Sequence, residues 1–580
     1  MSSKSSIIGV FAILFLLVVV IVVFHEAEYD VSISKQAGNI VAIDSEGKII
    51  ASGVSNLDDV SVIQKAFDSI TDNGIIHFDN SEYNLSRPVE VTNKSLVIQG
   101  SKAKFIINTG NSEPGYSFSG TRIKETRLLS NADKGDNLIV LDSTSDINPG
   151  DIITIYNDVS WCPDDYSDHK AGETYIVKSV FRDTVKLNSN LIRNYTTKLN
   201  SKARVYRPVT IKIDNCSFIG KGSEENVKGV MLKFCKNSKI SNCYFDNNGQ
   251  FSISFSTCYG IDVNKNVILN SNQDGYGYGV SISNACTDIK IRDNDIRYCR
   301  HCVASGCSDN YGVNRNIEIL SNTLYAGKEA AVDAHPVTLD YLVTNNTIYA
   351  ESNYAFSDGT IDSIFSNNIV YGNAVYKRGN ITNSKKIISN NHIEKGSLFY
   401  QNDYENISEM VIINNSIKGR ANDYGVYLKN TDVEKLNIDN NFITGVNYGI
   451  LIYVRLKSST ITISNNTIEE TRRDGIYLKY ETISDDRFLN ISHNTIQNTN
   501  KLNSDSNGIS LYGIKNAIVC NNQISDDYNQ TMYGIYEDNY CNYNSIYSNL
   551  IEGMVKGPVK IQGVNSIVKE NYSAFPRSVD

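Results

Sequence analysis

Residues 345–348 read Asn-Asn-Thr-Ile, residues 414–417 read Asn-Asn-Ser-Ile and residues 465–468 read Asn-Asn-Thr-Ile. The pattern, two asparagines or close substitutes followed by an aliphatic residue, recurs from the middle of the chain to its end. A fixed period of this size predicts a stacked repeat. The second position of the pair occurs 14 times, 22 to 28 residues apart, with a mean of about 25.6: Cys216, Cys243, Asn266, Asn294, Asn322, Asn346, Asn368, Asn391, Asn415, Asn441, Asn466, Asn494, Asn522 and Asn549.

The residue types within one repeat predict short strands. Runs such as 424–428 and 474–478 alternate apolar and polar residues, which is the period of a strand with one buried face. Asparagine tolerates the left-handed backbone of a sharp bend, and stacked asparagines can hydrogen-bond along a column. We therefore expect coils of two or three short strands, added at about 4.8 Å per coil, in a right-handed all-β solenoid.

With these repeats the chain resembles a right-handed parallel β-helix of the pectate-lyase-like superfamily over residues 43–575. The entry region fits the resemblance, because residues 58–67 read as a capped amphipathic helix. In that superfamily such a helix closes the N-terminal end of the solenoid. The resemblance implies the fold and leaves the activity open, since the scaffold hosts lyases, hydrolases, epimerases, phage tailspikes and adhesins.

The repeat divides the chain into four parts. Residues 1–30 form a cytoplasmic tail and signal-anchor helix, and residues 31–110 hold a connector, the cap helix and the first coils. Residues 111–208 break the period and predict an inserted β module with antiparallel strands near 150–155 and 172–177. Residues 209–580 carry the regular coils and a C-terminal cap.

Charge and the N-terminus indicate the compartment and the partners. The 55 basic and 64 acidic residues give a net charge of −9, which argues against nucleic acid as a partner. Residues 7–24 are apolar and follow Lys4, so we expect a single-pass cell-membrane protein with most of the chain extracellular. A cleaved signal peptide is the alternative, and the rod is exported in both cases.

No cofactor is expected from the motifs. The segment 161–169 contains acidic residues and a histidine that could bind calcium, but it lacks the spacing of a calcium loop. A solvated loop with a packed tryptophan is the other interpretation. Cys299, Cys302 and Cys307 lie near His301, yet their spacing fits no structural zinc pattern.

One strand carries an acid and an imidazole on the same face. Asp333 and His335 lie two residues apart, so they point to the same side of a strand. Small residues in the neighbouring coils predict a shallow depression around them. Arg300, His301 and Lys328 lie at the preceding bends of adjacent coils, and strand rise places the first two roughly 10–14 Å from His335.

Beyond this depression, tyrosines alternate with basic residues on the same face. Aromatic rings can contact sugars, and cations pair with carboxylates or sulfates. The row predicts a substrate-binding surface for acidic polysaccharide or another cell-surface glycan. Its members are Tyr376 with Arg378, Tyr427 with Lys429, and Tyr477 with Lys479.

The Asp333-Ala334-His335 element resembles the Asp-Pro-His signature of alginate epimerases, which use the same scaffold, and is similar to elements of phage-tail-like β-helix proteins. The resemblance implies a catalytic Asp333 and His335, with alanine in place of proline. A uronate lyase or C5-epimerase would then use His335 as base, Asp333 to orient His335 or the sugar, and His301 or a nearby tyrosine as acid. Arg300 or Lys328 would neutralise the uronate carboxylate.

Two other interpretations stay open at this point. Outward tyrosine, lysine and arginine columns also occur on ordinary solvated strand faces, and an aspartate and a histidine on one strand can simply bond to each other. A non-catalytic surface adhesin or envelope structural protein would bind glycans through the same face. Loss of turnover with retained binding in a His335→Ala variant distinguishes an enzyme from a binder.

Overall fold

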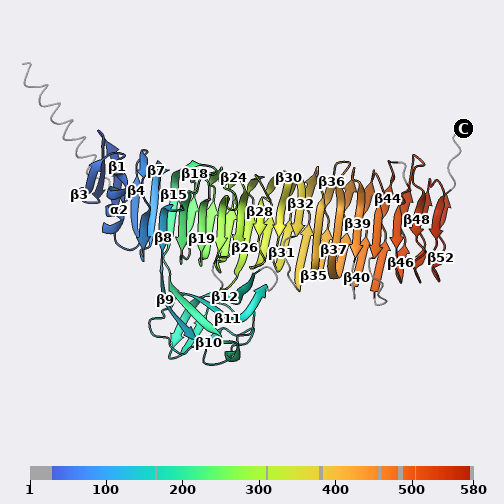
Figure 1. The fold of residues 1–580 in the computed structure, drawn as a ribbon, viewed down its shortest axis with the longest axis horizontal. Coiled ribbons are helices and arrows are strands. Elements are labelled where there is room, and N and C mark those ends of the chain that lie inside the picture. The colour runs from blue at the N-terminus through green and yellow to red at the C-terminus, as the bar shows by residue number, and fades with distance from the viewer. Residues whose placement is uncertain are drawn as a thin grey trace, which may run out of the picture.

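The computed structural model describes residues 29–574 except 111, 163–165, 309–310, 378–382, 455–458, 481–486 and 503–504. The chain forms a long rod of stacked coils, and a smaller β module stands beside its N-terminal half (Figure 1). Strands of successive coils pair in parallel, for example Ser281 with Ala304 and Ala304 with Asp333. The parallel β-helix predicted from the repeat is therefore confirmed.

Each regular coil contains three strands, which we number from the ladder asparagine that opens the coil. The first strands are β5 Glu82–Leu85, β18 Tyr244–Asn248, β21 Val267–Leu269, β24 Asp295–Cys299, β27 Thr323–Ala326, β34 His392–Glu394, β36 Ser416–Lys418, β38 Phe442–Thr444, β41 Thr467–Glu469, β44 Thr495–Gln497, β47 Gln523–Ser525, β50 Leu550–Glu552 and β53 Tyr572–Ala574. The third strands are β4 Gly74–Phe78, β17 Lys239–Ser241, β20 Tyr259–Asn264, β23 Thr287–Arg292, β26 Asn314–Leu320, β29 Thr338–Thr344, β31 Asp362–Ser366, β33 Ser384–Ser389, β40 Ser459–Ser464, β43 Arg487–Ser492, β46 Ala517–Cys520, β49 Ser545–Tyr547 and β52 Ile567–Lys569.

The second strands form the face that carries the candidate site. They are β6 Val89–Thr92, β8 Pro114–Ser119, β16 Lys228–Lys233, β19 Phe251–Ser256, β22 Tyr278–Ser283, β25 His301–Gly306, β28 Val332–Ala334, β39 Tyr448–Val454, β42 Ile476–Tyr480, β45 Ile509–Tyr512, β48 Tyr533–Glu537 and β51 Gly557–Ile561. Six longer strands continue through a bend and contribute to two faces: β7 Leu96–Ile107, β15 Ile211–Gly222, β30 Thr347–Asp358, β32 Ile369–Lys377, β35 Leu398–Ile413 and β37 Tyr424–Asp439.

An unbroken column of asparagines joins the coils. Asn391 illustrates the pattern, because its Nδ2 donates to Asn415 Oδ1 at 2.9 Å and to the backbone oxygen of Phe365 at 2.9 Å. Its Oδ1 accepts from the backbone N–H of Asn368 at 3.0 Å and from Asn368 Nδ2 at 3.1 Å. The same contacts run from Asn266 to Asn571, so the buried amides replace the backbone bonds that each bend interrupts.

The residue before each ladder asparagine makes the bend itself. Asn390 has φ +55° and is exposed, and Asn345 and Asn414 both have φ +57°. Asparagine reaches this left-handed region more readily than most residues. The repeated pair therefore divides two tasks, since the first asparagine turns the chain and the second bonds within the column.

A helix and three antiparallel strands close the N-terminal end. β1 Val31–Gln36 pairs antiparallel with β2 Asn39–Asp44, which pairs antiparallel with β3 Ile49–Val54. The helix α2, Asp59–Ser69, follows them and corresponds to the helix predicted at residues 58–67. The Phe67 ring lies 6.1 to 6.4 Å from aromatic rings of the first coils, so α2 shields their apolar interior.

The N-terminal cap of α2 differs from the sequence expectation. Asp58 occupies the N-cap position but makes no capping hydrogen bond with its side chain. Its carboxylate accepts from the backbone N–H of Val54 at 2.8 Å instead. Asp59 is the buried acid, and it receives Lys35 Nζ at 2.6 Å and the N–H of Asn84 at 2.7 Å. These contacts tie the helix to the antiparallel strands and the first coil.

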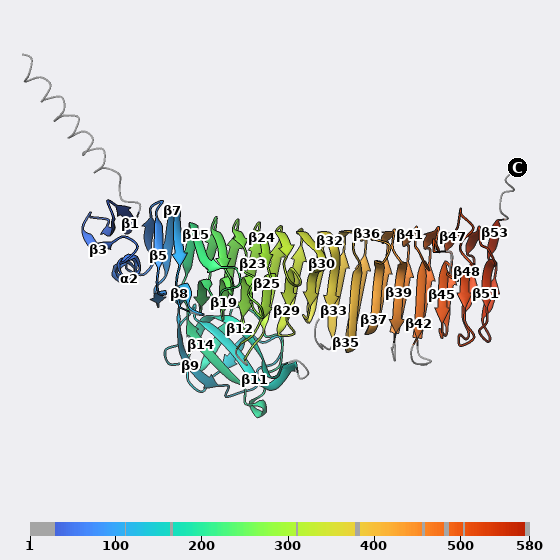
Figure 2. The same ribbon diagram turned by 45° about the horizontal axis from the view of Figure 1, so that its top comes forward.

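The β module lies between β8 and β15 in the chain and has its own small core. Its six antiparallel strands are β9 Thr121–Arg127, β10 Leu138–Val140, β11 Ile152–Cys162, β12 Tyr166–Phe181, β13 Thr184–Leu187 and β14 Lys202–Arg207, with the 3₁₀ turn η1 Thr197–Leu199. Both views place it along one side of the rod (Figures 1 and 2).

The predicted membrane anchor, residues 7–24, lies outside the described residues. Within the described part of the chain, no helix combines the length and the apolar character needed to cross a bilayer.

Candidate functional site

Three side chains from two adjacent coils meet on the second-strand face. Asp333 Oδ2 lies 3.1 Å from His335 Nε2 and 3.5 Å from His301 Nε2. The side chains of Asp333 and His301 are each 1% exposed, whereas that of His335 is 19% exposed. We call His301, Asp333 and His335 the relay, because one carboxylate serves two imidazoles.

In the relay, His301 lies closer to His335 than the rise per residue along a strand predicts. Ala304 pairs with Asp333 in the next coil, and His301 precedes Ala304 by three residues. By the same register, His301 lies beside Ala330. One coil spacing separates the two strands, and the imidazole and carboxylate reach toward each other across it. The expected separation of roughly 10–14 Å from His335 therefore overlooks the reach of the side chains, and Asp333 bridges the two rings.

Hydrogen bonding determines how protons are placed on the two rings. His301 Nδ1 lies 2.7 Å from the backbone oxygen of Ala330, which only accepts, so Nδ1 carries the hydrogen. The Asp333 carboxylate likewise selects the His335 tautomer with hydrogen on Nε2, and the lone pair of the neutral ring is then on Nδ1. The carboxylate thus orients His335 as the aspartate of a catalytic triad orients its histidine.

His301 Nε2 is buried and makes no hydrogen bond of normal geometry, although Glu329 Oε2 lies 3.2 Å away. Burial lowers the pKa of His301, and the Asp333 carboxylate partly opposes that shift. A neutral ring would direct its lone pair at two carboxylates. A proton on His301 Nε2 would therefore lie between the imidazole and the carboxylates of Asp333 and Glu329.

Arg300 and Lys328 have other partners. Arg300 forms a two-pronged ion pair with Glu329, at 3.0 Å from Nε and 3.1 Å from Nη2. Lys328 Nζ lies 2.7 Å from Asp274 and 3.2 Å from Glu224. Both cations are thus paired with acids in the structure, and their role in neutralising a uronate carboxylate stays a prediction.

These two cations hold the loop that forms one wall of the site. Arg300 Nη1 lies 3.3 and 3.2 Å from the backbone oxygens of Gly275 and Tyr276, and Lys328 donates to the backbone oxygen of Asn272 at 3.0 Å. At Gly277, with φ +85°, an added Cβ would come within 2.8 Å of Arg300 Cβ. The loop therefore requires glycine at this position.

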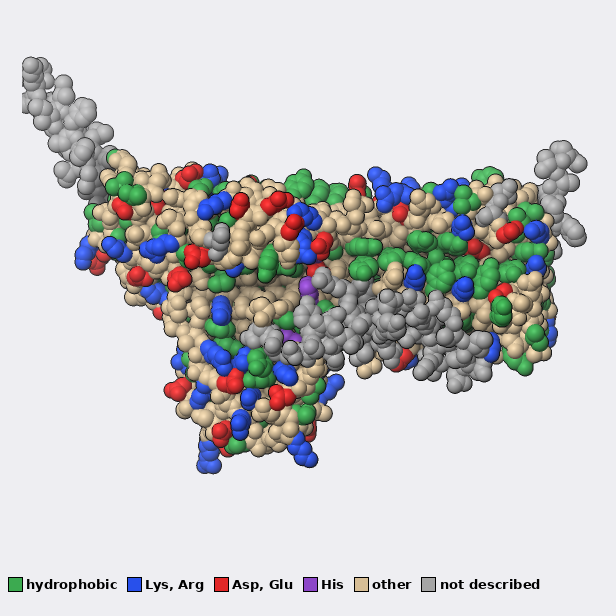
Figure 3. All heavy atoms as spheres, in the orientation of Figure 1, with side chains coloured by type: hydrophobic (Ala, Val, Ile, Leu, Met, Phe, Trp, Pro, Cys, Tyr) green, Lys and Arg blue, Asp and Glu red, His purple; other side chains and the backbone are tan. Residues whose placement is uncertain are grey.

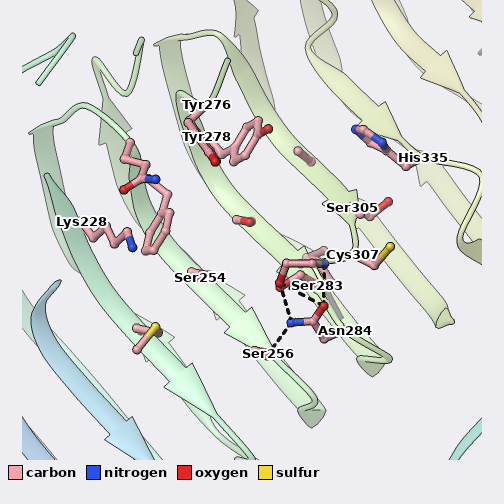
Figure 4. Close-up of a pocket in the computed structure, with 18 of the residues that line it drawn as sticks. Lys228, Ser254, Ser256, Tyr276, Tyr278, Ser283, Asn284, Ser305, Cys307 and His335 are labelled. Carbon is pink, nitrogen blue, oxygen red and sulfur yellow. Dashed lines mark hydrogen bonds between the residues drawn. The ribbon is translucent and has the colours of Figure 1, made fainter. Parts of the chain in front are cut away.

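A groove of about 490 Å³ lies on the N-terminal side of the relay, with His335 at one end (Figure 4). Strand register gives it three parallel columns. One edge is Lys228, Phe251, Tyr278 and His301; the floor is Met231, Ser254, Ser281, Ala304 and Asp333; the other edge is Lys233, Ser256, Ser283 and Gly306, followed by His335. The His335 ring lies 3.7 Å from where a Gly306 Cβ would be.

The polar and aromatic lining of this groove is not among the site residues that the sequence predicts. Tyr276 is 51% exposed, and the ring of Tyr278 lies 5.9 Å from that of His301. Lys228 and Lys233 line the far end. Residues 274–279, Asp-Gly-Tyr-Gly-Tyr-Gly, were the available signal, because glycines that alternate with aromatic residues interrupt the regular strand pattern.

A second hollow of about 440 Å³ lies on the C-terminal side of the relay. His301, Glu329, Tyr354 and Tyr376 line it. The relay therefore separates two depressions, and a chain lying along the rod axis would pass over it.

The predicted tyrosine row continues from this hollow toward the C-terminus. Figure 3 shows hydrophobic side chains gathered as a band over the coils of that half. Tyr376 is 37% exposed, and its ring lies 6.3 Å from that of Phe399. We call the exposed or half-buried rings of this row the aromatic band: Tyr354, Tyr376, Phe399, Tyr427, Tyr453, Tyr477, Tyr512 and Tyr536.

The basic members of the row lie beside the band. Lys429 and Lys479 both pair with Tyr453 in register, in the column next to that of Tyr427 and Tyr477. Arg378 lies outside the described residues. Phe399 occupies the outward position between Tyr376 and Tyr427, and the neighbouring Tyr400 is fully buried.

The β module contacts the rod next to the relay. Trp161 Nε1 donates to the backbone oxygen of Pro336 at 2.6 Å, directly after His335. The Arg193 guanidinium lies 3.9 Å from the Trp161 ring, and His169 bonds through Nε2 to the backbone oxygen of Gly312. The packed tryptophan is thus fixed against the bend that follows the relay.

In the described part of the chain, no group of three or more histidine, cysteine, aspartate or glutamate side chains is arranged so that it could hold a metal ion. Cys299 and Cys302 are buried thiols whose sulfurs approach backbone oxygens. Asp164 and Asp165, two acids of the segment considered for calcium, lie outside the described residues.

Comparisons with known proteins agree with this architecture. Residues 403–565 match the family described as "NosD: Periplasmic copper-binding protein (NosD)". The tailspike gp61 of Pseudomonas phage phi297 is similar in structure, with 17% identity over 83% of this chain and 74% of that chain and a TM-score of 0.50. The resemblance to right-handed parallel β-helix proteins is therefore confirmed in fold.

Two further solved structures are more distant. One is the Gp54 tailspike of Acinetobacter baumannii bacteriophage AP22 in complex with capsular saccharide, with 17% identity over 89% of this chain and 74% of that chain and a TM-score of 0.47. The other is the A-module of Azotobacter vinelandii mannuronan C-5 epimerase AlgE6, with 16% identity over 64% of this chain and 92% of that chain and a TM-score of 0.32. No curated protein matches the sequence.

Proposed function

We propose that this protein binds acidic polysaccharide along the second-strand face and modifies it by uronate lyase or C5-epimerase chemistry. The observation that carries the proposal is the relay, in which one buried carboxylate contacts two imidazoles beside a groove. Both reactions remove the proton next to the uronate carboxylate, and both need a base and an acid. Two imidazoles supply the two groups.

His335 acts as the base in this proposal. Its Nδ1 takes the C5 proton, and Asp333 holds Nε2–H and stabilises the imidazolium that forms. The electron pair of the broken C5–H bond moves toward the uronate carboxylate. In a lyase it then forms the C4–C5 double bond as the C4–O bond breaks.

His301 is the acid. Because burial lowers the pKa of His301, its imidazolium gives up a proton readily. That proton passes to the leaving oxygen in a lyase or to the opposite face of C5 in an epimerase. Arg300 can meet the substrate carboxylate only where that carboxylate replaces Glu329, whose side chain is 47% exposed.

The test uses purified protein with polymers of mannuronate, guluronate, galacturonate and glucuronate. A lyase gives ultraviolet absorbance from the unsaturated product, and an epimerase exchanges the C5 proton in heavy water. We expect His335→Ala and Asp333→Asn each to lower the rate at least about 100-fold, as loss of a general base does. Lys239→Gln, an exposed change on β17, is the control and should leave the rate unchanged. Absence of both signals on every polymer contradicts the proposal.

The aromatic band supports a second candidate, a glycan-binding surface protein without turnover. The band extends over many coils beyond the relay, which suits adhesion to a long polymer. The same His335→Ala variant separates the candidates. A binder keeps its affinity and never yields product, whereas an enzyme keeps affinity and loses product formation.

A further inference from the structure

We infer that Lys228 and Lys233 form an anion-binding subsite that holds the charged group of a sugar several units away from the relay. The inference rests on the proposed function and deepens it. It names the substrate class as a polysaccharide with acidic groups along its length, and it assigns recognition of those groups to residues at the N-terminal end of the groove.

Register places the two lysines opposite the relay along the groove. Lys228 lies in the column of His301, and Lys233 lies in the column that leads to His335. Three coil spacings, or about 14 Å, separate Lys228 from His301, and four, or about 19 Å, separate Lys233 from His335. A short oligosaccharide that reached both ends would have one sugar between the lysines and another at the relay.

The lysines differ from the other cations around the site in their partners. Among the described residues, neither Lys228 nor Lys233 has a carboxylate within ion-pair distance, whereas Arg300 and Lys328 both do. Lys228 Nζ lies 5.4 Å from the Phe251 ring, and Lys233 Nζ lies 4.9 Å from that of Phe234. The groove therefore contains positive charge that no described acid neutralises.

The environment of Lys228 favours an anion. Its side chain is half-buried, and burial lowers the pKa of its ammonium group. A desolvated cation without a counter-ion is costly, and a bound carboxylate or sulfate compensates for that cost. A neutral sugar offers only hydroxyl groups and leaves the charge uncompensated.

The groove between the two ends is built for a sugar chain. Gln250 lines it, is 6% exposed and has an amide oxygen with no hydrogen-bond partner. Such an oxygen can accept from a sugar hydroxyl. Ser254 and Ser281 add hydroxyl groups to the floor. Tyr276, labelled in Figure 4, provides an exposed ring on the wall.

The test is a binding measurement on the full chain that carries His335→Ala, so that turnover does not consume the ligand. Uronate oligosaccharides are titrated by calorimetry beside the same oligosaccharides after chemical reduction of their carboxyl groups. We expect Lys228→Gln to weaken binding of the acidic form about tenfold, the size of a lost charged hydrogen bond, and to leave the reduced form unchanged. Lys233→Gln should act in the same direction, and Lys239→Gln should change neither.

The outcomes separate this inference from the proposed reaction. Equal effects of Lys228→Gln on both forms, no effect on either, or no binding of any acidic oligosaccharide overturns the subsite. If the acidic form binds through Lys228 but the unmodified protein gives no product, the subsite stands and the reaction fails. If the unmodified protein turns over a uronate polymer at a rate that Lys228→Gln leaves unchanged, the reaction stands and the subsite fails.

Discussion

Burying a carboxylate near the second-strand face lowers the stability of the fold, and Asp474, which lies far from the relay, is an example. It lies two residues before the inward Ile476, as His301 lies two residues before the inward Val303. The Asp474 carboxylate accepts from Ser510 Oγ and, at 3.0 Å, from the backbone N–H of Asn507. Burial nevertheless raises the pKa of Asp474 to about 6, because two hydrogen bonds do not offset the loss of water.

We predict that Asp474→Asn stabilises the protein at pH 8. The pKa of Asp474 is higher in the folded state than the usual value of 3.8, so folding favours the protonated form. The fold loses stability as the pH rises above about 4, and the loss is complete above about pH 6. Asparagine keeps an accepting oxygen without the charge. The gain should reach about 3 kcal/mol at pH 8 and vanish below about pH 4.

Thermal unfolding at pH 4 and pH 8 measures this difference. Asp505→Asn is the matched control, because the side chain of Asp505 is 91% exposed and its charge is solvated. A lower unfolding temperature for Asp474→Asn at pH 8 would contradict the prediction.

At this scale the sequence could predict positions but not partners. The shared face of Asp333 and His335 could be predicted from strand alternation, since residues two positions apart on a strand point to the same face. The pairing of Lys328 with Glu224 joins residues 104 positions apart, and the length of the intervening loops conceals it. Lys228 and Lys233, which have no acidic partner among the described residues, were missed for the same reason, because the lack of a partner is recognised only when the surrounding residues have been placed.

Among the elements, the bend that opens each coil is the most regular and the most predictable. Its two asparagines have distinct environments: Asn390 is exposed with φ +55°, and Asn391 is 1% exposed within the ladder. A change at either position alters the same bend through a different cause.

We predict that Asn391→Ala destabilises the coils by about 2–4 kcal/mol. The substitution leaves the buried N–H of Asn368 without its acceptor and removes the donor from Phe365 and Asn415, and each unsatisfied buried group is costly. Amide hydrogen exchange should accelerate first at Asn368. Asn390→Gly is the control, because glycine adopts the left-handed conformation freely. A ladder substitution no more harmful than the control would contradict this account.

The other elements could be predicted unevenly. The coils and the cap helix follow from periodicity, which depends only on neighbouring residues. The antiparallel strands β1 to β3 could not be inferred, because hairpins before a repeat leave no periodic signal. Contact between Trp161 and Pro336 spans 175 positions and depends on where the β module docks, which no local pattern encodes.

At the scale of the whole molecule, the second-strand face has two halves of different chemistry. The N-terminal half is a polar groove with lysines, serines and an amide, and the C-terminal half is the aromatic band. The relay lies where they meet. Rings in the band are not uniformly stacked: Tyr376 and Phe399 are nearly parallel at 9°, whereas Tyr427 and Tyr453 meet at 80°. The turned rings can offer a face to a sugar.

We predict that the band contributes to binding of long polymers and leaves short ligands unaffected. Tyr427 lies about 19 Å from Asp333, and Tyr477 about 29 Å, at one coil spacing per step. An oligosaccharide that fills only the groove cannot reach either ring. If each ring contributes about 1 kcal/mol, Tyr427→Ala and Tyr477→Ala should each weaken polymer binding about fivefold. Tyr298→Ala, at a 55% exposed ring on a first strand, is the control. Affinities for a polymer and for a groove-length oligosaccharide, measured side by side, decide the matter: equal losses for both ligands, or none for the polymer, would show that the aromatic band does not hold the chain that the groove receives.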